Sequence, residues 1–167
     1  IVGVLLTAGI LFLFIHDLRQ TFIAAVTMPA SIISAFTLVY FAGFTLNVMS
    51  LMALGISVGI LVANAIVVLE NIYRYILLGK SPREAAAVGT SEIALAVLAS
   101  VLTNVVVFLP IAFMSGMVGE MFFQFGLTVT FATGVSLLIS FTLTPILSAF
   151  LLRSKDETRA TWAQWSH

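Results

Sequence analysis

Five long apolar runs separated by short polar gaps organise the chain. A bilayer core of about 30 Å requires a helix of about 20 apolar residues, and most of the runs meet this length. The apolar–polar alternation over about ten residues that is typical of strands in membrane barrels does not occur in them. We therefore predict an all-α, polytopic membrane helix bundle over residues 1–152, with spans at about 1–15, 22–44, 48–69, 93–114 and 125–152.

The first run is shorter than the others. As a helix it would reach only about 23 Å at about 1.5 Å per residue. The chain begins with Ile1 instead of Met and shows no basic region of a signal peptide before the run. We therefore expect residue 1 to lie within a span of a longer natural protein.

Two polar stretches are predicted to lie on the cytoplasmic side. The stretch 73–92 predicts a surface helix because residues 81–84 form a capping box with proline at the first helical position. A plain loop is the alternative. In the tail, 153–167, Trp162 and Trp165 would share one face of an interfacial helix, although a disordered end fits equally well.

The basic residues predict the orientation. Because alternate gaps lie on the same side when every span crosses, all seven Lys and Arg residues fall on one side of the membrane. That side is expected to be cytoplasmic, which places the N-terminus in the periplasm and the C-terminus in the cytoplasm. The connections on the far side are then 42–47 and 115–124. The basic residues are Arg19, Arg74, Lys80, Arg83, Arg153, Lys155 and Arg159.

Composition supports the membrane class and excludes others. The chain is 61% hydrophobic and 8% charged, against about 45–50% and about 25% in soluble domains. Its net charge of zero leaves no basic surface for nucleic acid. With no Cys and only His16 and His167, which are far apart, we expect no catalytic site, no metal site and no cofactor. The sequence therefore does not predict an enzyme.

A line of polar residues runs through the third predicted span. Ser50, Ser57, Asn64 and Asn71 recur every seven residues, and a helix drifts only about 20° per heptad, so they form one stripe. Asn64 lies near the middle of the membrane or somewhat nearer the cytoplasm, where an unsatisfied amide costs several kcal/mol. It must therefore face protein or water.

Two later spans offer partners for this stripe. Ser100, Thr103 and Asn104 lie on one face of the fourth span. One interpretation is a set of hydrogen bonds between helices, each contributing about 0.6 kcal/mol on average. The other is a wetted path for ions or water. The last span adds Ser136, Ser140, Thr142 and Thr144.

Small residues and charges complete the third span. Gly55 and Gly59 form a GxxxG motif that Ala63 continues, a pattern that favours close approach of another helix. Glu70 and Arg74 are spaced for an ion pair on one helix. No ionisable residue lies in the middle of any predicted span, so the chain contains no carboxylate proton relay of its own.

Several motifs of the chain match those of a known kind of membrane protein. The sequence GISVGILVANAIVVLENI at Gly55–Ile72 resembles the fourth transmembrane helix of the resistance-nodulation-division (RND) superfamily of efflux transporters. The other motifs follow in order and with matching spacing, and resemble its next helix, outer loop and sixth helix. They are Gly89–Ile93, Thr103–Pro110, Phe113–Gly119, Phe122–Phe125 and Ser140–Pro145.

The resemblance implies a location, an activity and partners. It implies that the chain holds the second to sixth helices of the N-terminal half of a transporter in the bacterial inner (cytoplasmic) membrane. Such proteins export drugs, detergents or metal ions using proton influx, and work as homotrimers. The implied partners are the lipid bilayer, the second half of the transporter with its periplasmic porter region, and an adaptor with an outer-membrane channel.

The sequence departs from the family at the proton-relay positions. Efflux members often carry an adjacent pair of aspartates where this chain has Ala63 and Asn64. An amide does not exchange a proton at ordinary pH, although its oxygen could bind Na⁺. Coupling through carboxylates elsewhere, operation beside a competent subunit, and loss of active transport all remain open. We therefore expect an exporter of amphiphilic compounds or ions, with a non-transporting assembly or sensing module as the alternative.

Overall fold

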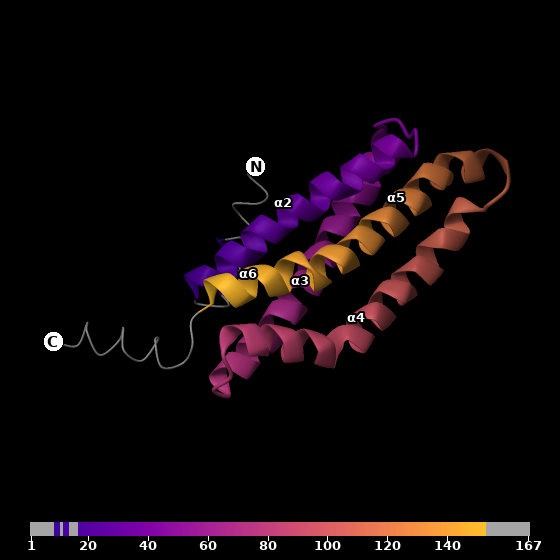
Figure 1. The fold of residues 1–167 in the computed structure, drawn as a ribbon. Helices are drawn as coiled ribbons and strands as arrows, with labels where there is room; N and C mark the ends of the chain where they lie inside the picture. Colours follow the sequence, from indigo (N-terminus) through magenta and orange to yellow (C-terminus); the bar gives the residue numbers. More distant parts are fainter. Residues whose placement is uncertain (1–8, 11, 14–16, 153–167) are drawn as a thin grey trace.

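The structure is an elongated bundle of α-helices (Figure 1). The computed structural model describes residues 9–10, 12–13 and 17–152, and no strand occurs among them. The all-α prediction is therefore confirmed for this part of the chain. The longer helices are α2 (Leu18–Phe41), α3 (Val48–Leu77), α4 (Pro82–Ala112), α5 (Gly116–Phe141) and α6 (Leu143–Leu151).

The number of spans differs from the prediction. Four segments of the described residues are long and apolar enough to cross a bilayer, namely α2, α3, α4, and α5 together with α6. The predicted count of five is therefore not matched. Most of the first predicted span, 1–15, and the predicted interfacial helix in 153–167 lie outside the described residues.

Helix α4 joins two elements that the sequence analysis kept apart. It begins at Pro82, as the capping box predicts, and the Ser81 Oγ accepts a 3.4 Å hydrogen bond from the Glu84 amide. A separate surface helix is nevertheless wrong, because the helix continues without a break to Ala112. Figure 1 shows that α4 changes direction along its length instead of ending. The connection before it shrinks to residues 78–81.

The far-side connections differ in the same way. Residues 42–47 join α2 to α3 as predicted, and Asn47 caps α3 with a reciprocal pair of bonds to Ser50. Most of the second predicted connection, 115–124, is helical, because α5 begins at Gly116. Glu120 is exposed and lies about one turn into that helix, where its charge can still reach water.

The last predicted span is divided into two helices. Helix α5 ends at Phe141 and α6 starts at Leu143. Pro145 has no amide hydrogen to donate to the carbonyl of Phe141, four residues earlier, so regular helical hydrogen bonding is interrupted at this point. The chain changes course at Thr142 and still reaches the end of the bundle.

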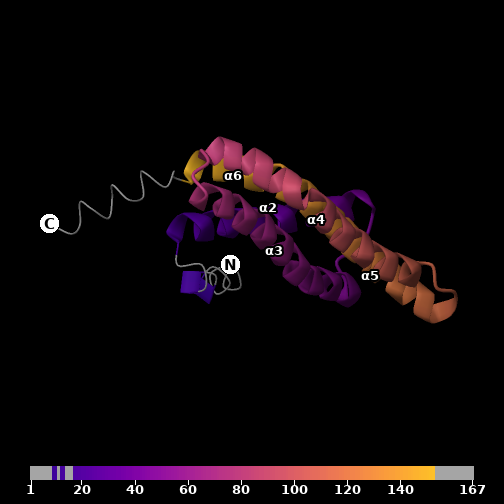
Figure 2. The same ribbon diagram turned by 90° about the horizontal axis from the view of Figure 1, so that it is seen from below.

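The main apolar core lies toward one end of the bundle. There the start of α2, the end of α3, the start of α4 and the end of α6 gather (Figure 2). The Arg19 Nη1 of α2 donates a 2.6 Å hydrogen bond to the carbonyl of Leu151 in α6. Arg74 lies on α3, Lys80 on the turn that follows it, and Arg83 on α4, so the described basic residues share this end. The largest buried core residues are Ile23, Leu69, Ile72 and Ile76.

Helix α5 packs between α3 and α4 over the rest of the length. Gly126 makes one of these contacts possible, because a Cβ at this position would stand 2.7 Å from the Phe108 carbonyl oxygen and 3.0 Å from the Ala112 amide nitrogen. The spacing between α4 and α5 therefore depends on the lack of a side chain at Gly126.

Candidate functional site

The polar stripe of α3 faces the interior of the bundle. Ser50, Ser57 and Asn64 are buried, and Asn71 is half-buried. The burial of Ser50, Ser57 and Asn64 fits the single stripe that the heptad spacing predicts. Asn64 is only 6% exposed, as expected for an amide at this depth.

The two serines of the stripe form hydrogen bonds with residues near them in the sequence. The Ser50 Oγ accepts a 2.9 Å hydrogen bond from the Asn47 amide at the start of α3. The Ser57 Oγ donates a 2.7 Å hydrogen bond to the Ala53 carbonyl of its own helix, which is common for a helical serine. These hydroxyls therefore contribute no hydrogen bond to another helix in the described part of the chain.

Asn64 is the stripe residue that reaches across at mid-helix. Its Nδ2 donates to the Ser136 Oγ of α5 over 3.5 Å. The distance is at the long limit for a hydrogen bond, so the bond is weak. The arrangement places an uncharged amide in the contact between α3 and α5.

The adjacent Ala63 is exposed, whereas Asn64 is buried. Gly55 and Gly59 are exposed as well. A Cβ built at Gly55 or Gly59 would meet no atom within 4 Å. Within the described residues, no helix uses the GxxxG motif for close packing, and the predicted role of these small residues stays a prediction.

The predicted partners on α4 are not those that the structure uses. Ser100 and Thr103 are exposed, Asn104 is half-buried, and the Thr103 Oγ1 bonds to the Ala99 carbonyl of its own helix over 2.8 Å. The expectation that this face of α4 meets the stripe is wrong for Ser100 and Thr103. Because α5 packs against both α3 and α4, it takes the place opposite Asn64.

Hydroxyl residues form a second buried line along α5 and α6. Three of their oxygens, on Thr128, Thr144 and Ser148, have no hydrogen-bond partner among the described residues. The sequence pattern did not single out Thr128 or Ser148, although consecutive members of the line are four or eight residues apart. Thr142, also noted there, is exposed. The buried line is Thr128, Ser136, Ser140, Thr144 and Ser148.

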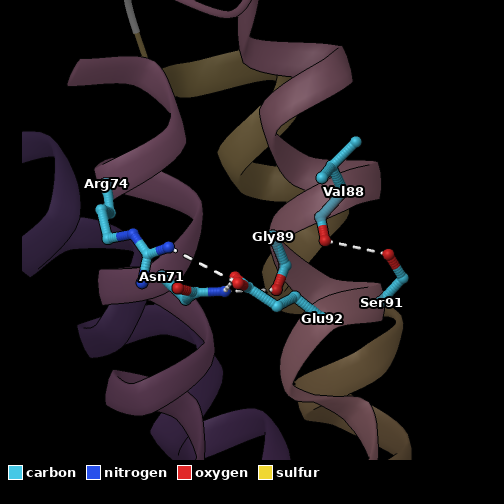
Figure 3. A network of polar contacts seen from close by, with 6 residues as sticks. All are labelled: Asn71, Arg74, Val88, Gly89, Ser91 and Glu92. Atoms are coloured by element: carbon cyan, nitrogen blue, oxygen red, sulfur yellow. Dashed lines mark hydrogen bonds and ion pairs between the residues drawn. The ribbon is translucent and has the colours of Figure 1, made fainter. Parts of the chain in front are cut away.

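A polar network ties α3 to α4 at the basic end of the bundle (Figure 3). The Asn71 Nδ2 donates a 2.7 Å hydrogen bond to the Gly89 carbonyl and a 2.9 Å hydrogen bond to the Glu92 Oε2. The Arg74 Nη2 lies 3.5 Å from the Glu92 Oε1. Asn71 therefore belongs to this helix junction as much as to the stripe.

Two details of the junction correct or extend the sequence analysis. The predicted ion pair between Glu70 and Arg74 is wrong, because Arg74 pairs with Glu92 across the junction. Gly89 is buried, and a Cβ on it would lie 3.0 Å from the Ile72 Cα, so a larger residue would push α3 and α4 slightly apart. No sequence periodicity pointed to the cross-helix bonds.

Titratable clusters do not mark a catalytic or metal centre in the residues that the structure describes. No group of three or more His, Cys, Asp and Glu side chains could hold a metal ion there. His16 and His167 fall outside those residues. The site is therefore a set of neutral hydrogen-bonding groups between helices, with one ionic junction at the end.

Comparison with known proteins agrees with the motifs. The sequence model of the AcrB/AcrD/AcrF family matches residues 1–167. The multidrug resistance protein MdtC of Proteus mirabilis is 47% identical over 142 residues, covering 85% of this chain and 14% of the relative. MdtC of Citrobacter koseri is 43% identical over 163 residues, covering 96% and 16%. The chain therefore spans about one sixth of the length of these relatives.

Proposed function

Because the chain belongs to the AcrB/AcrD/AcrF family of RND efflux transporters, we propose that it forms part of the membrane region of a pump that exports amphiphilic compounds or ions. The family match over the whole chain carries this proposal. The four segments able to cross a bilayer support it, as does the similarity to MdtC, a multidrug resistance protein.

The proposed location is the bacterial inner membrane, with the basic end of the bundle in the cytoplasm. Arg19, Arg74, Lys80 and Arg83 share that end, and an excess of Lys and Arg is typical of cytoplasmic connections. Under this orientation the N-terminal side of the chain lies toward the periplasm before its first span, and the C-terminal tail lies in the cytoplasm.

The exposed small-residue face of α3 supports a role for the second half of the transporter. Gly55, Gly59 and Ala63 leave room for a close helix that the described residues do not supply. We assign this face to that second half. The homotrimer, the periplasmic porter region, the adaptor and the outer-membrane channel are proposed from family membership alone.

Proton uptake at residue 64 is not part of the proposed mechanism. The Asn64 amide holds a bond to Ser136 and does not titrate at ordinary pH. Ala63 offers no ionisable group and is exposed. The energy for export must therefore enter through carboxylates elsewhere in the complete protein or through a competent neighbouring subunit.

The neutral Ala63–Asn64 pair also favours a second function. A membrane module that has lost transport, and serves assembly or sensing, would keep the bundle while dispensing with titratable groups. The local satisfaction of Ser57 by its own helix fits a purely structural stripe. Activity of the complete protein separates the two functions.

The test expresses the full-length protein in a pump-deficient bacterium and measures drug tolerance and dye efflux. Export by the parent protein supports transport, and loss of export in Asn64→Leu supports a role for the buried amide. Ser100→Leu is the matched control, because it makes the same kind of change on an exposed face of α4. Trimer yield checks that each variant assembles. No export by the parent under any gradient would contradict the transporter proposal.

A further inference from the structure

A groove with a volume of about 500 Å³ lies between the first turns of α4 and helix α6. Its α4 wall is made mainly of small residues, and its α6 wall of large apolar ones. From Arg83 at one end to Ala94 at the other, the groove follows α4 for about 16 Å at about 1.5 Å per residue. Residues on the two walls include Ala87, Thr90, Ala94, Pro145, Ile146 and Phe150.

A cation stands at the end of this groove. The Arg83 guanidinium carbon lies 5.9 Å from the centre of the Phe150 ring, so the ring and the cation attract each other across the groove. The ion pairs of the described residues are Arg74–Glu92 and Lys80–Glu84, and Arg83 takes part in neither. Its charge is therefore held in place by an aromatic ring without being neutralised by a carboxylate.

The walls of the groove are mainly apolar, and Thr90 is one of the lining residues. The Thr90 Oγ1 has no hydrogen-bond partner among the described residues, but the atom itself is buried and is not open to the groove. The neighbouring Ser91 hydroxyl donates a 2.9 Å hydrogen bond to the Val88 carbonyl of its own helix. The groove thus combines a cation without a carboxylate partner at one end with mainly apolar walls along its length.

Helix α6 and the later part of α4 belong to segments that are apolar enough to cross a bilayer, and the α4 wall of the groove, residues 83–94, leads into that apolar part. Arg83 lies at the basic end of the bundle, the end expected near the lipid headgroups. When the bundle crosses a membrane in this way, the apolar walls of the groove face lipid. A cation at its headgroup end then favours a lipid with a negative headgroup.

We propose that this groove binds one anionic phospholipid of the phosphatidylglycerol type. The headgroup phosphate takes the hydrogen-bond donors of Arg83, since a guanidinium matches a phosphate in both charge and geometry. One acyl chain lies between α4 and α6, against Ala87, Ile146 and Phe150. The proposal requires only that α4 and α6 cross a membrane, so it stands or falls independently of transport.

The test titrates the purified, delipidated full-length protein with phosphatidylglycerol and with phosphatidylcholine of the same acyl chains. Bound lipid is counted by native mass spectrometry. Phosphatidylglycerol should bind more tightly, and Arg83→Gln should weaken its affinity by about fivefold, the effect of one basic residue near a membrane surface. Lys80→Gln is the matched control, because Lys80 already pairs with Glu84. It should leave the affinity near the parental value.

A second variant separates a groove from a mere surface charge. Ala87→Phe places a large ring in the groove while Arg83 stays intact, and it should also weaken phosphatidylglycerol binding. Glycerol 3-phosphate, which has the phosphate without acyl chains, should not displace the lipid. Displacement by it would identify a free-anion site and overturn the proposal. Parental affinity in Arg83→Gln or in Ala87→Phe, equal affinity for phosphatidylcholine, or no binding by the parent would also overturn it.

Discussion

The Asn64 Nδ2 lies 3.5 Å from the Ser136 Oγ, across the contact between α3 and α5. Both side chains are buried, at 6% and 1% exposure, so neither finds an alternative partner in bulk water. A buried polar group that loses its partner costs more than the net value of the bond itself, about 1–3 kcal/mol. The pair is therefore sensitive to removal of one member.

Ser136→Ala should lower the stability of the bundle by about 1 kcal/mol, because it leaves the Asn64 amide without its partner on α5. Thermal unfolding of the full-length protein in lipid nanodiscs measures the change. Ser100→Ala is the control on an exposed face of α4 and should change the unfolding temperature little. Equal effects of the two substitutions would show that the Asn64–Ser136 contact contributes nothing.

Gly126→Ala should destabilise the α4–α5 contact by about 1–3 kcal/mol, the usual range for overpacking. The added methyl group would meet the Phe108 carbonyl, which belongs to the backbone and has little freedom to move aside. Gly134→Ala provides the matched control in the same helix, since no atom lies within 4 Å of its Cβ position. That control should be neutral or stabilising, because Ala favours helix by about 1 kcal/mol over Gly. A neutral Gly126→Ala, measured by the same unfolding assay, would contradict the packing described for α4 and α5.

Asn71→Leu should loosen the junction between α3 and α4. The change removes the hydrogen bonds to the Gly89 carbonyl and to Glu92, and it leaves that carboxylate with Arg74 and Tyr75 as partners. Hydrogen exchange should therefore speed up at backbone amides in the residues 71–92. Ser91→Ala is the control from the same turn, because its hydroxyl bonds only within α4 (Figure 3). Exchange rates that rise equally in both variants would show that the network does not hold the junction.

Gly59→Leu should impair assembly of the complete protein without unfolding this chain. The described residues leave open space at Gly59, whereas a second half packed there would clash with a leucine. Ala99→Leu makes a comparable enlargement on an exposed face of α4 and should be tolerated. The yield of folded protein and trimer after purification is the readout. Parental yields for Gly59→Leu would remove the basis for assigning this face to the second half.

The membrane class and the inward stripe could be predicted because they depend on periodicity along one helix. Ser50, Ser57 and Asn64 lie on one face whatever packs against it. Periodicity does not say which helix will be the neighbour. Ser100 shares a face of α4 with Asn104, which suggests a partner for the stripe. In the structure α5 lies opposite Asn64 instead, and Ser100 is exposed.

The boundaries of the helices are less predictable because a charged residue in the sequence suggests the end of a span even where the helix continues past it. Glu92 and Arg74 neutralise each other laterally, and Asn71 completes the Glu92 contacts. Charges satisfied in this way do not end a helix, so α3 extends to Leu77 and α4 includes the predicted surface helix. The break before Pro145 was predictable in principle from the proline, and the close contact at Gly126 required the partner helix to be known.

Dye efflux by the full-length Asn64→Asp variant, measured from acidic to alkaline medium in a pump-deficient bacterium, tests most directly whether residue 64 stands at the position of a proton relay. The parent carries an amide that does not titrate, and Asn64→Ser is a polar control that does not titrate either. If the bundle retains the proton path of its family, the aspartate variant should acquire a dependence of efflux rate on pH that the parent and the serine variant lack. An efflux rate for Asn64→Asp that follows the parental pH profile throughout the range would contradict the assignment of residue 64 to a proton-relay position.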